Sequence, residues 1–230
     1  DVAVELVGVG KAFDHRPVLR GIDLRVLAGE TVAVLGANGS GKSTLLRVLA
    51  TLLAPSRGTI SWFGRPTDSL PAVRRRLGFV PHESLLYGGL TVEENLRFFA
   101  GLYGLVAARA DAALEELELH GLRSRRARIL SRGQRQQADL ARALLHNPDV
   151  LILDEPFTGL DLEAVLRLQS LLESQRARGR TLIFTTHDPN EARALADRAT
   201  VLLGGRLTAA VPPGELDDAQ LAAWFRQGRR

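Results

Sequence analysis

The residues best suited to chemistry form a glycine-rich run with one lysine, and their spacing points to phosphate binding. The run lies between an apolar stretch, 31–35, and a helix-patterned stretch, 44–53, and it comprises Gly36, Ala37, Asn38, Gly39, Ser40, Gly41, Lys42, Ser43 and Thr44. Glycines let the backbone turn its N–H groups inward, so that they form an anion nest at the positive end of a helix. Lys42 would reach the β- and γ-phosphates of a nucleotide, and the Ser43 hydroxyl would bind Mg²⁺.

A glycine turn that binds nothing is the alternative for this loop. Lysine usage weighs against it, because the chain holds only one other lysine, Lys11, and arginine supplies nearly all of the remaining basic charge. A compact ammonium fits between phosphate groups better than a planar guanidinium does. A lysine at this position therefore favours phosphate binding.

Two acidic residues and one histidine follow apolar runs that are typical of buried strands. Asp154 and Glu155 come directly after the run 150–153, and His187 follows the run 181–186. Ligands of open α/β sheets bind at such strand ends. Asp154 is the candidate for the metal, Glu155 for polarising an attacking water, and His187 for contacting a γ-phosphate. Alternatively, Asp154 and Glu155 only cap a loop, and His187 has a purely structural role.

These side chains need a sheet that brings several strand ends together, and the apolar pattern predicts one. The continuous runs 31–35, 150–153 and 181–186 are typical of parallel strands that are buried on both faces. Helical patterns lie between them, so the sequence predicts an α/β fold with a parallel sheet flanked by helices.

Alternating patterns near the start of the chain predict a different kind of strand. Residues 2–7 and 18–27 alternate between apolar and polar, which is typical of half-buried strands, and their short connection favours antiparallel pairing. Phe13 is expected in the turn between them. From the pattern alone, it is either part of the core or a platform that stacks on a nucleotide base.

The middle of the chain reads as helical. Thr91 and Glu94 have the spacing of a capping box, and helical patterns follow at 107–119 and 131–145. This stretch lacks strand patterns. We therefore expect a helical lobe inserted into the α/β core.

Composition narrows the classes of protein. The chain has 230 residues, 45% of them hydrophobic and 24% charged, which is enough for one large domain or two small lobes. It has no cysteine, which excludes disulfides and thiol-ligated metals and fits a cytosolic protein. No apolar run reaches the ~18 residues of a membrane span, so we expect any membrane role to depend on a partner.

The positive charge could indicate nucleic-acid binding, but the pattern disfavours it. The formal charge is +4 and the pI is about 10.2. The arginine clusters at 74–76 and 123–128 carry no interleaved aromatic residues of the kind that a single-strand binder uses. We therefore expect no nucleic-acid partner.

Residues 130–134, here called the signature segment, carry a family resemblance. They read Leu130, Ser131, Arg132, Gly133 and Gln134, and they resemble the signature motif of the ATP-binding-cassette (ABC) ATPases. Together with the phosphate loop and the segments 151–155, 159–161 and 185–188, they follow the order and spacing of that family over essentially the whole chain.

The resemblance implies a P-loop NTPase core of the ABC type in a single domain spanning 1–230. An N-terminal antiparallel β subdomain belongs to the core, which would cover about 1–83 and 146–230. A helical subdomain would be inserted at about 84–145.

The resemblance also implies roles for single residues around ATP and Mg²⁺. Phe13 would stack on adenine, and Asp154 would lie on the metal side. Glu155 would be the general base, with Lys42 and His187 completing the catalytic set. The phosphates and Mg²⁺ would be held by the loop residues Gly36, Asn38, Gly39, Ser40, Gly41, Lys42, Ser43 and Thr44.

A dimer follows from the same resemblance. Ser131, Gly133 and Gln134 would bind the nucleotide of a second copy of the chain, and Asp161 would act across the same interface, although it could be only a helix cap. Two chains would pack head to tail around two ATP molecules. The pair would drive a transmembrane permease subunit and lie on the inner face of the cell membrane.

Two positions depart from the family pattern. His82 stands where the family usually has glutamine, so we expect it to contact the nucleotide and Mg²⁺ with a weaker or pH-sensitive link. Arg132 replaces the usual glycine of the signature, and its side chain must either point away from phosphate or clamp it.

Residues 84–90 are either an exposed contact for the permease or part of the helical core.

The subgroup is suggested by several residues. His82, the run 85–87 and the variant at Arg132 are similar to the ATPase subunit of the haem exporter used in cytochrome c maturation. Exporters of lipids, polysaccharides and drugs share these features. Non-transport members that act in translation or DNA maintenance typically have two cassettes, a long coiled coil or zinc inserts, none of which this sequence predicts.

Overall fold

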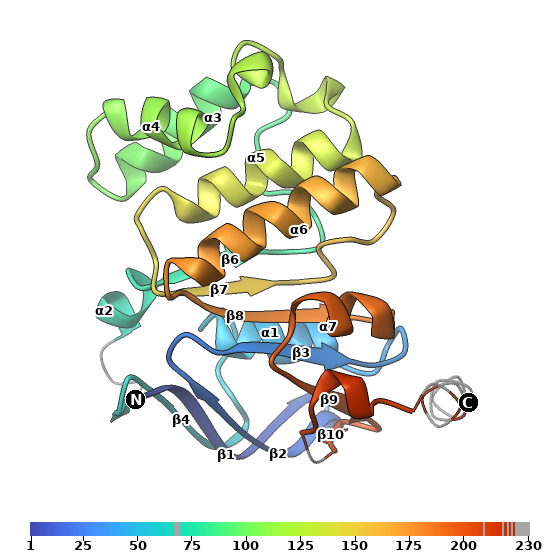
Figure 1. Ribbon diagram of the computed structural model, residues 1–230. Coiled ribbons are helices and arrows are strands. Elements are labelled where there is room, and N and C mark those ends of the chain that lie inside the picture. Colours follow the sequence, from blue (N-terminus) through green and yellow to red (C-terminus); the bar gives the residue numbers. More distant parts are fainter. Residues whose placement is uncertain (67–69, 209, 218, 220, 222, 224–230) are drawn as a thin grey trace.

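A six-stranded sheet runs through the middle of the molecule (Figure 1). Its strand order is β10-β9-β3-β8-β7-β6, with all neighbours parallel except β10, which is antiparallel to β9. The bounds are β3 (Thr31–Leu35), β6 (Leu77–Val80), β7 (Val150–Leu153), β8 (Thr181–Thr186), β9 (Arg198–Leu203) and β10 (Arg206–Leu207). Every residue of β3, β7 and β8 is buried, which explains their continuously apolar sequences. This computed structural model describes residues 1–66, 70–208, 210–217, 219, 221 and 223.

A second, antiparallel sheet has the order β2-β1-β4-β5 and confirms the pairing predicted from alternation. Its strands are β1 (Val2–Phe13), β2 (Arg16–Leu27), β4 (Arg57–Trp62) and β5 (Arg65–Pro66). The prediction that Phe13 lies in the turn is wrong by one residue. It ends β1, because register shifts beside Gly8, with φ 58°, let the strand continue to a tight turn at Asp14 and His15.

Seven helices surround the sheets in the described part of the chain: α1 (Lys42–Leu49), α2 (Leu70–Arg74), α3 (Val92–Leu102), α4 (Ala108–Glu116), α5 (Arg132–Leu144), α6 (Leu162–Ala177) and α7 (Pro189–Leu195). Short 3-10 turns η2 (His120–Leu122), η3 (Ala127–Ile129) and η4 (Pro213–Glu215) complete the elements. Figure 1 shows α3 and α4 at the end of the molecule beyond α5, and the antiparallel sheet at the other end.

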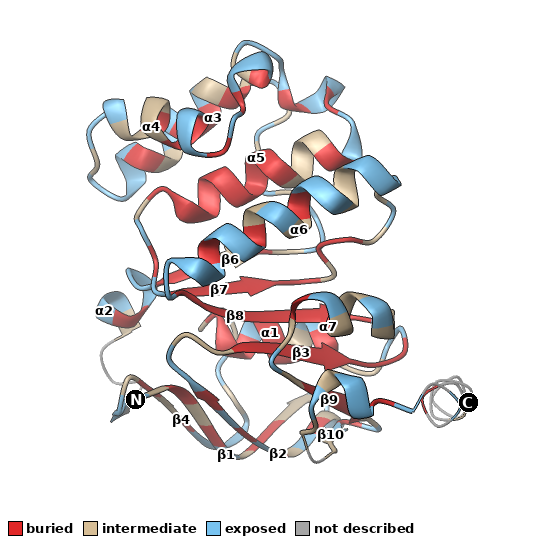
Figure 2. Ribbon diagram, viewed as in Figure 1, coloured by how far each residue is buried: buried red, intermediate tan, exposed pale blue. Residues whose placement is uncertain are grey.

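The central sheet separates two hydrophobic clusters, and β7 shows how. Leu151 and Leu153 join a cluster with α3–α6, whereas Val150 and Ile152 join a cluster with α1 and the antiparallel sheet. Figure 2 shows the buried strands between these layers. Alternate side chains of one strand point to opposite faces, so a fully apolar strand fixes both layers.

Helix ends follow local sequence closely. The Thr91 hydroxyl accepts a hydrogen bond from the Glu94 N–H, and the Glu94 carboxylate accepts one from the Thr91 N–H. The predicted capping box is therefore confirmed. Ser131 and Gln134 form a second capping box at α5. The sequence also predicts a terminal helix at 215–225, and residues 218, 220, 222, 224 and 225 of it lie outside those that the structure describes. No helix in the described ranges combines the length and apolarity that crossing a membrane requires.

Candidate functional site

The glycine-rich loop connects the end of β3 to the start of α1. Gly39 and Gly41 have φ values of 81° and 105°, in the region that favours glycine, and Gly41 is the N-cap of α1. A Cβ at Gly36 would lie 2.6 Å from Ser40 Oγ and 3.0 Å from the Leu202 carbonyl oxygen. The loop therefore keeps its tight shape only with glycine at these positions.

A cleft of about 470 Å³, here called the phosphate cleft, opens above this loop. It gathers ends of β3, β6, β7 and β8 that are far apart in the sequence, as expected for the carboxyl ends of parallel strands. Its lining includes Val18, Asn38, Gly39, Gly41, Lys42, Ser43, Thr44, His82, Glu155, Thr158 and His187. The structure therefore brings most of the predicted phosphate, catalytic and metal residues to one place.

Lys42, which is buried, and Glu155, which is partly buried, form an ion pair in the cleft. Lys42 Nζ lies 2.9 Å from Glu155 Oε1 and donates hydrogen bonds to the carbonyl oxygens of Gly36 and Ala37, at 2.8 and 3.2 Å. Burial raises the pKa of the Glu155 carboxyl. The hydrogen bond and charge of Lys42, with smaller contributions from Thr158 and His187, lower that pKa by more than burial raises it. The net pKa is below the ordinary value, so Glu155 is ionised at neutral pH.

Glu155 has a backbone conformation that few residues adopt. Its φ is +48°, whereas the preceding residues are extended in β7. The Thr158 Oγ1 donates to Glu155 Oε2 at 3.2 Å, and His187 Nδ1 lies 3.8 Å from the same oxygen, beyond hydrogen-bond distance. The carboxylate therefore faces the cleft beside both His187 and Lys42.

Thr185 connects the two neighbouring acids and was missed as a site residue by sequence reasoning. Its buried hydroxyl accepts a hydrogen bond from the Glu155 N–H at 2.9 Å and donates one to Asp154 Oδ1 at 2.8 Å. Asp154 is itself buried and lies behind the cleft wall rather than on it. A threonine inside an otherwise buried strand was the available signal, because a buried hydroxyl needs a partner.

The donor set fits a Mg²⁺-bound nucleotide. Ser40 Oγ is buried without a hydrogen-bond partner beside the loop, and the Ser43 hydroxyl lies on the cleft at the helix start. Among the described residues, no group of three or more histidine, aspartate or glutamate side chains could hold a metal without help. Mg²⁺ usually binds through one or two protein oxygens plus substrate phosphates. Ser43 can supply such an oxygen on the cleft, and the Asp154 carboxylate lies behind the cleft wall.

Phe13 lies outside the lining of the phosphate cleft. Its side chain is 43% exposed, which excludes the alternative that it is part of the core. The Lys11 ammonium lies 5.2 Å from the centre of its ring. An exposed ring at the end of β1 is free to stack on a planar group.

The signature segment lines a separate pocket of about 160 Å³, here called the signature pocket. Ser131, Gly133 and Gln134 meet Asp161 there, at the adjacent N-termini of α5 and α6. Asp161 Oδ1 caps α6 by accepting a hydrogen bond from the Ala164 N–H at 2.8 Å. Among the described residues, none that lines this pocket also lines the phosphate cleft, so the two are separate cavities within one chain.

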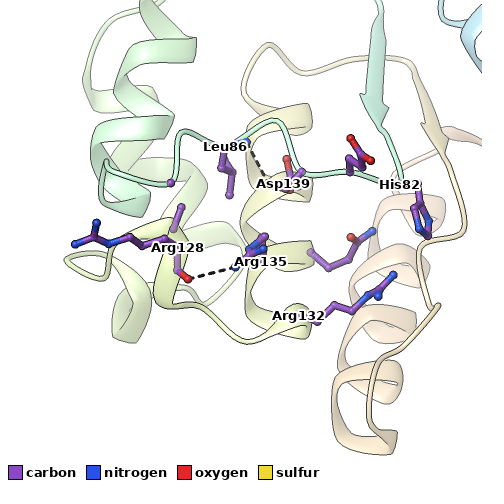
Figure 3. Close-up of a pocket in the computed structure, with 11 residues that line it drawn as sticks. His82, Leu86, Arg128, Arg132, Arg135 and Asp139 are labelled. Atoms are coloured by element: carbon purple, nitrogen blue, oxygen red, sulfur yellow. Dashed lines mark hydrogen bonds between the residues drawn. The ribbon is translucent and has the colours of Figure 1, made fainter.

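A third and larger pocket, of about 740 Å³, lies between the loop after β6 and α5 (Figure 3). We call it the arginine pocket, because Arg128, Arg132 and Arg135 line it together with His82. His82 lines the phosphate cleft as well, so it stands between the two cavities.

A buried acid fastens the loop after β6 to α5 at the arginine pocket. Asp139 Oδ1 accepts hydrogen bonds from the Leu85 N–H at 3.2 Å and from Arg142 Nε at 3.3 Å. Burial raises the pKa of Asp139 more than Arg142 lowers it. Of residues 84–90, Leu86 packs on the core, whereas Leu85 and Tyr87 are exposed, so a permease contact stays a prediction for the exposed residues.

Comparison with known proteins gives similar relatives over most of the chain. A family model described as ABC transporter matches residues 19–158. The Nod factor export ATP-binding protein I of Cupriavidus pinatubonensis is 39% identical over 223 residues, covering 95% of this chain and 69% of that protein. The sulfate/thiosulfate import ATP-binding protein CysA of Caulobacter vibrioides is 38% identical over 234 residues, covering 97% and 68%.

Solved structures agree with the fold. The structure of cbiO1 from Clostridium perfringens, described as part of the ABC transporter complex cbiONQ, matches with a TM-score of 0.84 at 30% identity and covers 94% of this chain and 90% of that one. The dimeric post-hydrolysis structure of the ATP-binding cassette MJ0796 with ADP and Pi matches with a TM-score of 0.83 at 29% identity, covering 91% and 98%. The predicted fold class is therefore confirmed.

Proposed function

The chain belongs to the ABC transporter family and is an ATPase subunit of that family, and we propose that it works as a head-to-tail dimer on a transmembrane permease. The observation that carries the dimer is the separation of the signature pocket from the phosphate cleft within one chain. A nucleotide in the cleft would be enclosed only when a second copy brings its signature pocket over it.

The phosphate loop would hold the triphosphate of ATP in this proposal. Backbone N–H groups around Gly39 and Gly41, and the Lys42 ammonium, would bind the phosphates, supported by Gly36, Asn38, Ser40 and Thr44. Ser43 and Asp154 would hold Mg²⁺, with His82 beside them, and the metal would neutralise phosphate charge during transfer. The exposed Phe13 ring would stack on adenine.

Glu155 would act as the general base for the attacking water. The Lys42 contact keeps its carboxylate ionised, the Thr158 hydroxyl donates to that carboxylate, and the Thr185 hydroxyl holds the Glu155 backbone N–H. His187, adjacent to that carboxylate, would contact the γ-phosphate. A base must be ionised and within reach of the water, and these contacts serve both conditions.

Opening and closing of the dimer would couple hydrolysis to transport. Ser131, Gly133, Gln134 and Asp161 would bind the partner's nucleotide, so each γ-phosphate would be held from both sides. Hydrolysis removes that bridge and the pair opens.

The permease would bind at the arginine pocket and the neighbouring apolar side chains. Tyr87 and Phe98 are 52% and 41% exposed and pack edge to face at 5.0 Å. Exposed aromatic groups of this kind are typical of protein contacts. We propose that the helical subdomain, about 84–145, carries this contact and that the chain lies on the inner face of the cell membrane through it.

The last part of the proposal concerns the substance that the transporter carries. Haem export for cytochrome c maturation rests on the sequence features around His82, Leu85–Tyr87 and Arg132. A second candidate is favoured by the relatives, several of which are named Nod factor export ATP-binding protein. Comparing haem and Nod factor uptake into inverted vesicles that contain the chain and its permease would separate the two.

The central test is gel filtration of the purified chain with and without MgATP. We expect Glu155→Gln to bind ATP, to lose hydrolysis and to elute as a dimer, because the nucleotide bridge then persists. Wild type with ADP is the control and should elute as a monomer. Full turnover by Glu155→Gln would exclude Glu155 as the base, and a monomer under all conditions would exclude the dimer.

A further inference from the structure

Arg132 occupies the signature position that the family usually fills with glycine, and the proposed function gives it no role in ATP hydrolysis. It is the first residue of α5, directly after the cap Ser131. Figure 3 shows its side chain leaving α5 at the edge of the arginine pocket. Its direction decides between the two alternatives that the sequence leaves open.

The guanidinium lies over the backbone of Gly159. A Cβ built at Gly159 would lie 2.9 Å from Arg132 Nη1, 3.0 Å from Cζ and 3.1 Å from Nε. Gly159 also has φ +72°, where other residues are strained. The arginine therefore reaches this loop only because residue 159 has no side chain.

The next residue makes a second close contact with the same part of the chain. A Cβ at Gly133 would lie 2.6 Å from the Ala164 Cβ, so α5 and α6 touch at their N-termini. Arg132 thus packs on the loop, and Gly133 lets the helix that follows the loop approach α5 closely. Two adjacent residues of the signature segment therefore pack against residues 159–164.

The loop under Arg132 carries groups of the phosphate cleft. Thr158, which precedes Gly159, donates its hydroxyl to Glu155 Oε2 at 3.2 Å and its N–H to the Glu155 carbonyl oxygen at 3.2 Å. A shift of Gly159 would move Thr158 and change the orientation of the carboxylate. Small displacements of a catalytic group reduce rates strongly.

We propose that Arg132 is a positioning residue for ATP hydrolysis, which acts through Gly159 and Thr158 on Glu155 of the same chain. This inference rests on the proposed ATPase function and role of Glu155. It also links the signature segment, which serves the partner's nucleotide in that proposal, to the chain's own cleft.

The test is steady-state ATP hydrolysis by Arg132→Gly and Arg132→Lys, with thermal melting as the measure of folding. We expect Arg132→Gly to lower kcat by about fivefold or more with KM and melting temperature unchanged. Arg132→Lys keeps the length and charge but not the planar group, so its kcat should lie between those of wild type and Arg132→Gly.

A double-mutant cycle with Gly159→Ala checks the contact itself. Gly159→Ala should lower kcat in wild type, because the methyl group meets the guanidinium, and lower it less in the Arg132→Gly background, where only the φ strain remains. The inference is overturned if Arg132→Gly leaves kcat unchanged, or if its loss of kcat comes with a lower melting temperature. It is also overturned if the effects of the two substitutions on kcat are additive. A wild-type chain without ATPase activity would overturn the proposed function instead.

Discussion

At the scale of single residues, Thr185 joins the two acids through one buried hydroxyl. We expect Thr185→Val, which has nearly the same shape, to lower the free energy of unfolding by about 1–3 kcal/mol, because the Glu155 N–H and Asp154 both lose a partner. ATPase activity should fall with it. Thr185→Ser keeps the hydroxyl and is the control; urea unfolding and ATP turnover measure both effects. Equal stability of the valine and serine variants would contradict the role of the hydroxyl.

The ion pair between Lys42 and Glu155 makes a second residue-scale prediction, for pH. The folded-state pKa of Glu155 lies below the ordinary 4.5. Its contribution to stability is therefore complete above pH 4.5 and is lost as the pH falls through the folded pKa. We expect the difference in unfolding free energy between wild type and Glu155→Gln to shrink below pH 4.5.

Urea unfolding of both proteins across the acidic range measures this difference. A difference that stays constant, or that grows as the pH falls, would show that Lys42 does not stabilise the ionised carboxylate. Lys42→Met in the Glu155→Gln background serves as a control, since it should add no pH dependence in this window.

At the scale of elements, the contact between α5 and α6 depends on a single missing side chain. Gly133 meets the Ala164 Cβ, which is fixed to a helix backbone and has no freedom to move aside. We expect Gly133→Ala to destabilise the fold by about 1–3 kcal/mol through overpacking. Gly101, in α3, has no atom within 4 Å of a built Cβ. Gly101→Ala should instead stabilise by about 0.5–1 kcal/mol, and thermal melting distinguishes the two.

The ends of the helices show how far local sequence specifies where an element begins and ends. The cap of α3 was predicted from Thr91 and Glu94, because a capping box closes within four residues, whereas the box of Ser131 and Gln134 at α5 was found only in the structure. The end of α4 was not predicted: the pattern continued to 119, but Glu118 adopts φ +55° and the helix ends at Glu116. Local hydrogen bonds close the helix there, from the Leu119 N–H to the Leu114 carbonyl oxygen at 2.8 Å, in a cap that usually has glycine where this chain has Glu118.

At the scale of the whole molecule, our proposal assigns three cavities to the nucleotide, a second copy of the chain and the permease. The exposed aromatic pair Tyr87 and Phe98 does not line the last of these cavities, but Tyr87 lies between Leu86 and Gly88, which do. We expect Tyr87→Ser with Phe98→Ser to reduce co-purification with the permease while ATP turnover of the isolated chain stays within twofold. Val7→Ser, at an exposed valine of β1, is the control and should leave co-purification unchanged. Retained binding by the double variant would place the permease elsewhere.

The sequence alone determined the phosphate loop, the buried strands and the order of the motifs, because glycine spacing, apolar runs and helix caps act over a few residues. It also identified Asp154, Glu155 and His187 as residues at strand ends. Only the tertiary structure decided that Thr185 connects the two acids and that Arg132 lies over Gly159. These contacts join residues about 30 positions apart, and their geometry depends on how the helices and strands pack rather than on any local pattern.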